Sequence, residues 1–291
     1  MKYLHFLLLA VCLVSCEKPL ILDEDSSVSD SEANLIVTVY QMETIPFSKS
    51  MSRAALADHC TRLNFAVYDS LNTRVEQINQ LSSDQGFGTA YFKLDPGKYR
   101  VVVVAHSSDG NPTMTNPAKI QFKNNQGYTD TFMSNDTIEV GESSVTLPVD
   151  LNRIVSLCRF VITDPVPDNI SQMRFQYTGG SGAFDASTGL GSVKSTQTVW
   201  INDINPGQES SVFDLYTFLH AEEGTIHLLA TAYDENSNVQ HEREFDIPMK
   251  RRKITKLTGA YFSDSPSGSS STITVIINFN DDWEGEDVIS Y

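Results

Sequence analysis

The chain has 291 residues, a formal net charge of −16, 40% hydrophobic residues and four cysteines. Its length suggests two domains of ordinary size, and its apolar content is sufficient for packed cores, which excludes a wholly disordered chain. The large negative charge argues against a surface that binds nucleic acid or anionic lipid headgroups.

The N-terminus has the pattern of a bacterial export signal. Lys2 supplies one positive charge, and residues 4–14 form an apolar run that only His5 interrupts. A run of this length is too short to span a bilayer as a helix, which takes about 20 residues. We therefore predict a cleaved signal peptide over residues 1–15.

The signal ends in the sequence Leu13-Val14-Ser15-Cys16, which resembles a lipobox. We predict that Cys16 becomes the first residue of the mature protein, with a diacylglycerol on its thiol and a third acyl chain on its amine. Three chains make a stable anchor at about 0.8 kcal/mol per buried methylene. The alternative is an ordinary secretory signal with a cysteine by chance. Glu17 gives no support for retention in the inner membrane.

The remaining cysteines are interpreted as packing residues. Loss of the signal removes Cys12, and lipidation uses Cys16, so Cys60 and Cys158 are left as thiols. These two could pair in an oxidising compartment. Cys158 lies in an alternating apolar stretch at residues 153–162, which favours a buried free cysteine on one strand face with Ile154. Neither thiol has the neighbours of a catalytic nucleophile.

Residues 16–33 form an acidic, serine-rich tether, and from Asn34 onward apolar and polar residues alternate with the period of β-strands. Turn sequences such as Asp95-Pro96-Gly97 separate the short β-branched and aromatic runs. Residues 111–134 are expected to hold a short helix in a polar insertion. The pattern predicts an all-β protein with antiparallel sandwich architecture. The predicted strands are residues 35–40, 63–69, 89–94, 99–107, 137–140, 144–151, 153–162, 173–178, 198–203, 211–219, 225–233, 242–249 and 271–279.

A weak internal repeat supports two domains. The segment that begins at Gly97 resembles the one that begins at Gly224, and residues 63–69 align loosely with residues 157–164. We predict an N-terminal β-sandwich domain over residues 34–152 and a C-terminal one over residues 153–291.

The sequence contains none of the common catalytic motifs: GxSxG, HExxH, a glycine-rich phosphate loop and CxxC are all missing. His220 and His227 flank a turn and could approach one another, but a structural pair of strand histidines is favoured over a metal site. We therefore predict no enzyme activity, no catalytic residues, no metal and no cofactor.

Several segments, taken in order, resemble the fimbrillin-related lipoproteins of Bacteroidetes, and specifically the FimB-type anchor subunits of type V pili. The family often has Asn where this chain has Arg252, so the chain departs from the family's pattern at this turn. The segments that carry the resemblance are the lipobox, the turn and strand at residues 92–107, the stretch at 153–162, the strand, basic turn and strand at 245–262, and the closing strand at 275–283.

The resemblance implies two transthyretin-like antiparallel β-sandwich domains, lipidation in the outer membrane, and a role at the base of a fimbrium or in its assembly. Subunits of such a structure are joined by β-strand complementation, in which a partner's extended segment completes an open sheet. The candidate exchange segment carries apolar residues on one face, and we expect it to pair within its own domain. These residues are Ile273, Val275, Ile277 and Phe279.

Shaft relatives are cut after an arginine near the N-terminus, and Arg53 is the nearest candidate here. An anchor must keep its lipidated end, so we expect the bond after Arg53 to stay intact.

The sequence thus predicts a non-enzymatic outer-membrane lipoprotein that acts as an anchor or assembly subunit of a fimbrium. The expected partners are the outer membrane, through the N-terminal lipid, and other fimbrial subunits, with no nucleic acid. One alternative is a shaft or tip subunit. Another is a surface glycan-binding lipoprotein, which would need an exposed aromatic platform at Trp200 or Trp283.

Overall fold

The computed structural model describes residues 32–43, 53–263, 276–278 and 286–290. The signal peptide, Cys16 and most of the tether therefore lie outside the described residues. So do Trp283 and three residues of the candidate exchange segment, Ile273, Val275 and Phe279.

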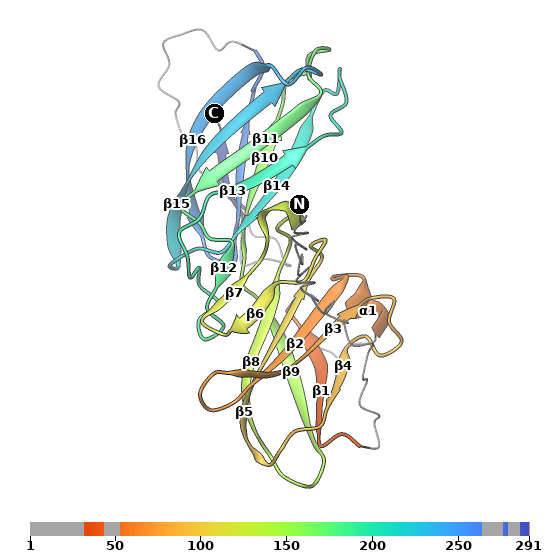
Figure 1. The fold of residues 1–291 in the computed structure, drawn as a ribbon. Coiled ribbons are helices and arrows are strands. Elements are labelled where there is room, and N and C mark those ends of the chain that lie inside the picture. The colour runs from red at the N-terminus through yellow and green to blue at the C-terminus, as the bar shows by residue number, and fades with distance from the viewer. Residues whose placement is uncertain (1–31, 44–52, 264–275, 279–285, 291) are drawn as a thin grey trace, which may run out of the picture.

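The described chain is almost entirely β-structure, which confirms the all-β prediction. Helical residues are limited, in this part of the chain, to α1 (Arg53–Ala57) and the 3-10 turn η1 (Asn124–Gln126). Figure 1 shows the strands gathered into two elongated groups placed end to end. We call them the N-terminal lobe, up to β9, and the C-terminal lobe, from β10; the region where they meet is the waist.

The N-terminal lobe is one sheet of seven strands in the order β3-β2-β5-β8-β9-β1-β4. Only two residue pairs join β8 to β9, so the sheet folds at this point into a four-stranded and a three-stranded layer. Leu35 and Val37 of β1 pack against Phe65 and Val103 in the core between the layers. The strands are β1 (Leu35–Met42), β2 (Arg62–Tyr68), β3 (Arg74–Leu81), β4 (Thr89–Phe92), β5 (Gly97–His106), β8 (Phe132–Val140) and β9 (Val145–Arg153).

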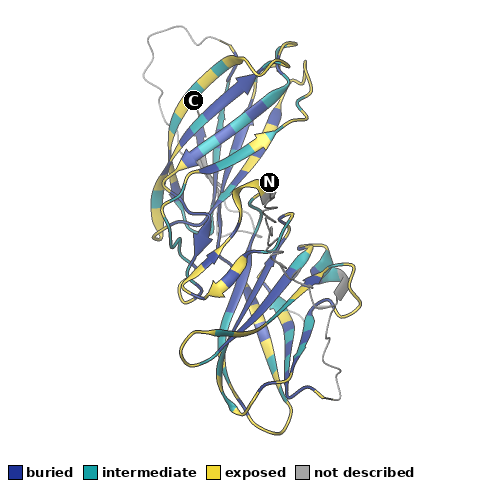
Figure 2. Cartoon of the chain, in the orientation of Figure 1, coloured by how far each residue is buried: buried dark blue, intermediate teal, exposed yellow. Residues whose placement is uncertain are grey.

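The C-terminal lobe has two sheets, ordered β14-β10-β17-β19-β18 and β13-β11-β15-β16. Phe160 on β10 contacts the rings of Phe175 and Tyr261, which fill the core between the sheets. Figure 2 shows buried residues along the strands of both lobes and exposed residues mainly in the loops and turns. The strands are β10 (Ser156–Ile162), β11 (Gln172–Thr178), β13 (Gln197–Ile201), β14 (Ser211–Thr217), β15 (Glu223–Tyr233), β16 (Val239–Lys250), β17 (Ile254–Gly259), β18 (Ile276–Asn278) and β19 (Glu286–Ser290).

The two lobes repeat one topology. In chain order, β1, β2, β3, β4, β5, β8 and β9 correspond to β10, β11, β13, β14, β15, β16 and β17, and the parallel pair β1/β9 corresponds to β10/β17. The repeat between Gly97 and Gly224 falls on β5 and β15, which hold equal positions. The alignment of residues 63–69 with 157–164 is wrong, because it matches β2 to β10.

The waist contains a three-stranded sheet in the order β12-β7-β6, from β6 (Thr113–Asn116), β7 (Lys119–Gln121) and β12 (Ala183–Phe184). The short helix expected in residues 111–134 is wrong, because this segment makes two strands, the η1 turn and the start of β8. Its apolar residues, such as Ile120, are buried in the waist against Phe184 and Phe218 of the other lobe.

Besides β6, β7 and β12, three strands are not predicted from the alternation of apolar and polar residues: β3, β17 and β19. β3 is an edge strand with polar residues on both faces, so it shows no apolar periodicity. β17 follows β16 through a turn at Arg251 and Arg252, and this turn carries the chain from one sheet of the lobe to the other. Arg252 has φ of +61°, a left-handed conformation that Asn tolerates better than Arg.

Both described cysteines are buried and free, which confirms the interpretation of Cys158. Burial raises the pKa of the Cys60 thiol to about 12, and burial together with the Asp214 charge raises the pKa of Cys158 to about 12. Cys158 packs in the C-terminal core, whereas Ile154 precedes the strand and packs in the waist, so the two do not share one strand face.

His106 is the centre of a buried polar network in the N-terminal lobe. The Ser108 N–H donates to His106 Nδ1 at 3.1 Å, so the ring proton is on Nε2, which donates to Asn64 Oδ1 at 2.8 Å. Burial, and then the Arg62 charge, lowers the pKa of His106 from its ordinary 6.5 to about 3.

This pKa predicts a loss of stability in mild acid. Between about pH 6.5 and 3 the unfolded chain binds a proton at His106 that the native protein does not. The free energy of unfolding should therefore fall by about 2 kcal/mol from pH 7.5 to pH 5 on account of this residue alone. Urea unfolding of wild type and His106→Gln at both pH values measures it, and equal losses in the two proteins would contradict it.

Candidate functional site

The described residues contain no cluster of His, Cys, Asp and Glu side chains that could hold a metal ion. His220 Nδ1 contacts the carbonyl oxygen of Gly191 at 2.8 Å, and His227 Nδ1 contacts Asp246 Oδ1 at 2.5 Å. The two histidines thus have separate partners, and no hydrogen bond or ring contact among the described residues joins them.

No helix in the described ranges has the length and apolar character needed to cross a bilayer.

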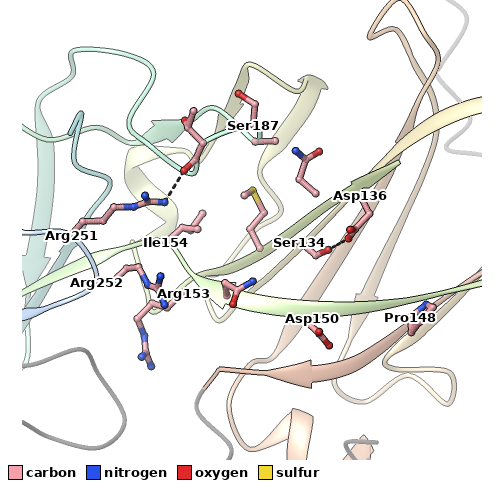
Figure 3. Close-up of a pocket in the computed structure, with 14 residues that line it drawn as sticks. Ser134, Asp136, Pro148, Asp150, Arg153, Ile154, Ser187, Arg251 and Arg252 are labelled. Atoms are coloured by element: carbon pink, nitrogen blue, oxygen red, sulfur yellow. Dashed lines mark hydrogen bonds between the residues drawn. The ribbon is translucent and has the colours of Figure 1, made fainter. Parts of the chain in front are cut away.

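A cleft of about 370 Å³ lies at the waist, between β8 and β9 of one lobe and the turn after β16 of the other. Arg251 and Arg252 lie on one side of this cleft, and Asp136 and Asp150 lie on the opposite side (Figure 3). Ser134 donates a hydrogen bond to Asp136 within it. The cleft is polar and is lined by residues of both lobes, as ligand sites between domains often are.

The arginines of the cleft are already engaged with the protein. Arg153, 3% exposed, makes two hydrogen bonds of 2.8 Å to the Asp130 carboxylate. Arg251 donates to Glu222 at 2.8 Å and to the Thr188 carbonyl at 2.7 Å. A guanidinium with such partners stabilises the fold, so the cleft is better described as a structural junction than as an anion-binding site.

Glu43 is the residue that ties the two lobes at this junction. It follows β1, and its Oε2 accepts the Arg153 N–H at 2.5 Å, while its Oε1 accepts a hydrogen bond from the Arg252 guanidinium. Arg252 belongs to the C-terminal lobe, so one carboxylate spans the waist. This role could not be predicted from local sequence, because Glu43 and Arg252 are 209 residues apart.

Backbone pairing and packing reinforce the waist. The Phe122 N–H donates to the Gly182 carbonyl at 3.0 Å, and the Ala186 N–H donates to the Pro117 carbonyl at 2.8 Å. A Cβ atom at Gly182 would lie 2.5 Å from the Tyr128 hydroxyl, so any larger residue here would require the Tyr128 ring to move. The two lobes are therefore joined by a hydrogen-bonded, packed interface.

The outer edge of the five-stranded sheet contains part of the candidate exchange segment. β18 includes Ile277 and pairs with β19 over three residue pairs, and β19 pairs in parallel with β17. In the part of the chain that the structure describes, no strand pairs with the other side of β18. The remaining three residues of the segment lie outside this part.

Asp164 fixes the chain just before that segment. Its carboxylate accepts the N–H groups of Tyr261, Phe262 and Ser263 at 2.6–2.8 Å, together with the Ser263 hydroxyl. Partial burial raises the pKa of Asp164, but these hydrogen bonds outweigh it, and the pKa lies below its ordinary value. One side chain thus holds residues 261–263, which follow β17, and no sequence pattern had indicated Asp164 for this role.

Trp200, one of the two aromatic residues considered for a platform, lies on the outer face of β13 and is 48% exposed.

Comparison with known proteins identifies a family and a fold. The model of the family of unknown function DUF6562 matches residues 25–291, so the chain belongs to that family. A search among curated proteins finds no match.

Solved structures of similar fold come from Bacteroidetes. A candidate adhesin from Bacteroides ovatus has 15% identity and a TM-score of 0.50, over 75% of this chain and 84% of that one. A second candidate adhesin from Bacteroides ovatus has 13% identity and a TM-score of 0.48, over 75% and 78%. The fimbrial anchor protein Mfa2 from Porphyromonas gingivalis has 12% identity and a TM-score of 0.41, over 72% and 80%.

The junction at Glu43 can be tested by one substitution. Glu43→Gln keeps the shape of the side chain but removes the charge that holds Arg252 and the Arg153 N–H. We expect a loss of about 1.5–3 kcal/mol in the free energy of unfolding, the range for hydrogen bonds to charged groups. Glu142→Gln, at an exposed position of the same lobe, is the control and should change it by less than about 0.5 kcal/mol. Similar losses in both variants would contradict the role of Glu43.

Proposed function

We propose that this member of the DUF6562 family is a non-enzymatic, lipid-anchored subunit at the base of a fimbrium, joined to its neighbours by β-strand complementation. The observation that carries the proposal is the position of β18 at the edge of the five-stranded sheet. It contains Ile277 of the exchange segment and is held by only three residue pairs.

An edge strand presents unpaired backbone N–H and C=O groups along its free side, and another extended chain can pair with them. A three-residue strand forms a short ladder, which a longer incoming strand can extend or replace. Recognition by strand addition takes its affinity from these main-chain hydrogen bonds. The place for a neighbouring subunit is therefore at β18.

The N-terminal lobe supports the anchor form of the proposal. β1 lies between β9 and β4 and contributes Leu35, Val37, Val39 and Met42 to the core. The chain from a lipid at Cys16 enters the fold through this strand. A cut after Arg53 would separate the lipid, β1 and Glu43 from the rest of the protein, so an anchor requires that this bond stay intact.

We also propose that each lobe is a transthyretin-like domain, with the boundary between residues 152 and 153. The repeated seven-strand topology supports this division, as do the two cores, one from residues 35–151 and the other from residues 158–289. A shaft or tip subunit would share this architecture and would differ in processing at its N-terminus.

Cys16→Ala tests the lipid anchor. Without the thiol there is no acylation, so the variant should leave the membrane fraction in detergent-free buffer, whereas the wild type stays in it. The intact mass of the wild-type protein from outer membranes should correspond to residues 16–291 plus three acyl chains. Retention of the variant in membranes would overturn lipidation, and a mature protein that lacks residues 16–53 would overturn the anchor role.

Cross-linking tests the subunit contact at β18. Because Cys60 and Cys158 are buried with a raised pKa, neither should react with a maleimide in the folded protein, so Asn278→Cys supplies the thiol for the test. A maleimide that carries a benzophenone couples to the Asn278→Cys thiol, and on irradiation the benzophenone inserts into a C–H bond of whatever chain lies beside it. On intact cells this reagent should join Asn278→Cys to another fimbrial subunit, identified by mass spectrometry. Asn236→Cys, in the exposed turn after β15, is the control and should give no adduct. If Asn278→Cys and Asn236→Cys give the same pattern of adducts, the proposed subunit contact at β18 is wrong.

A further inference from the structure

Trp200 exposes 48% of its surface, which is a large fraction for the side chain with the greatest apolar area. Its neighbours on β13, Val199 and Ile201, pack against the core of the C-terminal lobe. The indole therefore lies on the opposite, outer face of the four-stranded sheet. No strand or loop in the described residues covers it completely.

The indole of Trp200 packs against two side chains of the same sheet, Tyr233 and Arg174. Its ring centroid is 5.5 Å from that of Tyr233, which is only 7% exposed, and the two planes are inclined by 35°. The Arg174 guanidinium carbon lies 5.6 Å from the Trp200 ring and 5.5 Å from the Tyr233 ring. Contacts of this kind hold the ring in one orientation with one face toward solvent.

Polar groups follow the indole in a row across the sheet. Strand register places Trp200 opposite Arg174, Arg174 opposite Thr231, and Thr231 opposite Glu242. Arg174 Nη2 donates to Thr231 Oγ1 at 3.3 Å, and Thr231 donates to Glu242 Oε2 at 3.1 Å.

Arg174 has donors to spare in this row. No carboxylate in the described residues forms an ion pair with Arg174, and the hydrogen bonds of its terminal nitrogens there are limited to the one from Nη2 to Thr231. Glu242, on β16, is exposed and offers its second carboxylate oxygen. A flat aromatic surface thus lies beside one set of hydrogen-bond donors and one set of acceptors.

This combination suits a pyranose ring. The C–H groups on one face of a sugar are weakly positive and pack against the negative face of an aromatic ring, while its hydroxyls both donate and accept hydrogen bonds. The single positive charge of Arg174 and the single negative charge of Glu242 balance along the row, which favours a neutral sugar over a charged one.

A protein partner fits the patch less well. Stable protein interfaces bury about 800 Å² per partner around an apolar centre. Val239, opposite Tyr233, is the neighbouring exposed apolar residue. The other exposed large apolar residues of the described chain belong to other strands or loops: Tyr40, Leu71, Val75, Leu81 and Val212. One indole in a polar row is too small a centre for such an interface.

We propose that Trp200, Arg174 and Glu242 form a binding subsite for a neutral pyranose unit of a polysaccharide. The sugar stacks on the exposed face of the indole, and its hydroxyls bond to the Arg174 guanidinium and the Glu242 carboxylate. The proposal does not depend on the fimbrial role, because it rests on a different sheet from β18.

Affinity electrophoresis tests the subsite, since the strongly acidic protein migrates well in native gels. The detergent-solubilised protein is run in gels that contain laminarin, mannan, galactomannan, dextran, pullulan or hydroxyethylcellulose, with polygalacturonate as the anionic probe. We expect retardation in at least one neutral gel, more than tenfold weaker affinity in Trp200→Ala, and partial recovery in Trp200→Phe. Val212→Ala, an exposed apolar position on β14, is the matched control and should bind as wild type.

A second measurement reports contact with the indole itself. Trp283→Phe leaves Trp200 as the only tryptophan, because the chain has two. Its emission should shift to the blue when the retarding polysaccharide is added. The proposal is overturned by no retardation in any neutral gel, by retardation in polygalacturonate alone, or by equal binding of Trp200→Ala. A change of Trp200→Ala from dimer to monomer in sedimentation would also overturn it, since the patch would then be a contact between copies.

Discussion

The carboxylate of Glu43 is the constraint on which the arrangement of the two lobes depends. It accepts the N–H of Arg153, where β9 ends, and it binds the guanidinium of Arg252 from the other lobe. A buried guanidinium costs several kcal/mol unless it is paired, and Asp130 supplies that pair for Arg153. The acidic groups of the N-terminal lobe thus hold the chain at the point where it passes into the second lobe. The β7/β12 pairing and the buried cluster around Phe184 and Phe218 add backbone and apolar contacts between the lobes.

Most strands could be predicted from the sequence because each buries one face, which imposes a period of two on the side chains. The exceptions have physical reasons. β3 is an edge strand that is polar on both faces, so no apolar alternation marks it. β6, β7 and β12 are short, and β7 pairs with a segment of the other lobe, which no local pattern records. β17 has no clear alternation of its own, and it was expected only because residues 245–262 resemble a strand, turn and strand of a known family.

Individual residues of the candidate site were harder to foresee than the fold. The burial of Cys158 followed from its alternating apolar neighbours, and the choice of Trp200 as an aromatic candidate followed from its residue type. Glu43 and Asp164 act on groups that are 110 and 97 residues away, respectively, so their roles depend on the tertiary fold. Asp164 has no sequence signal, because an aspartate before a proline is usual in loops. Arg252 adopts a positive φ at this turn, and such a backbone conformation cannot be read from the neighbouring residues.

The position of β1 has a mechanical consequence. For a protein tethered through Cys16, tension would enter the fold at the N-terminal end of β1 and run along the strand. β1 is flanked on both sides, with seven residue pairs to β9 and four to β4. Its interstrand hydrogen bonds lie across the direction of pull, so they carry the load together, as in shear, instead of breaking one after another. Such a strand resists extraction far better than one at the edge of the sheet, and resistance of this kind is what an attachment point under strain requires.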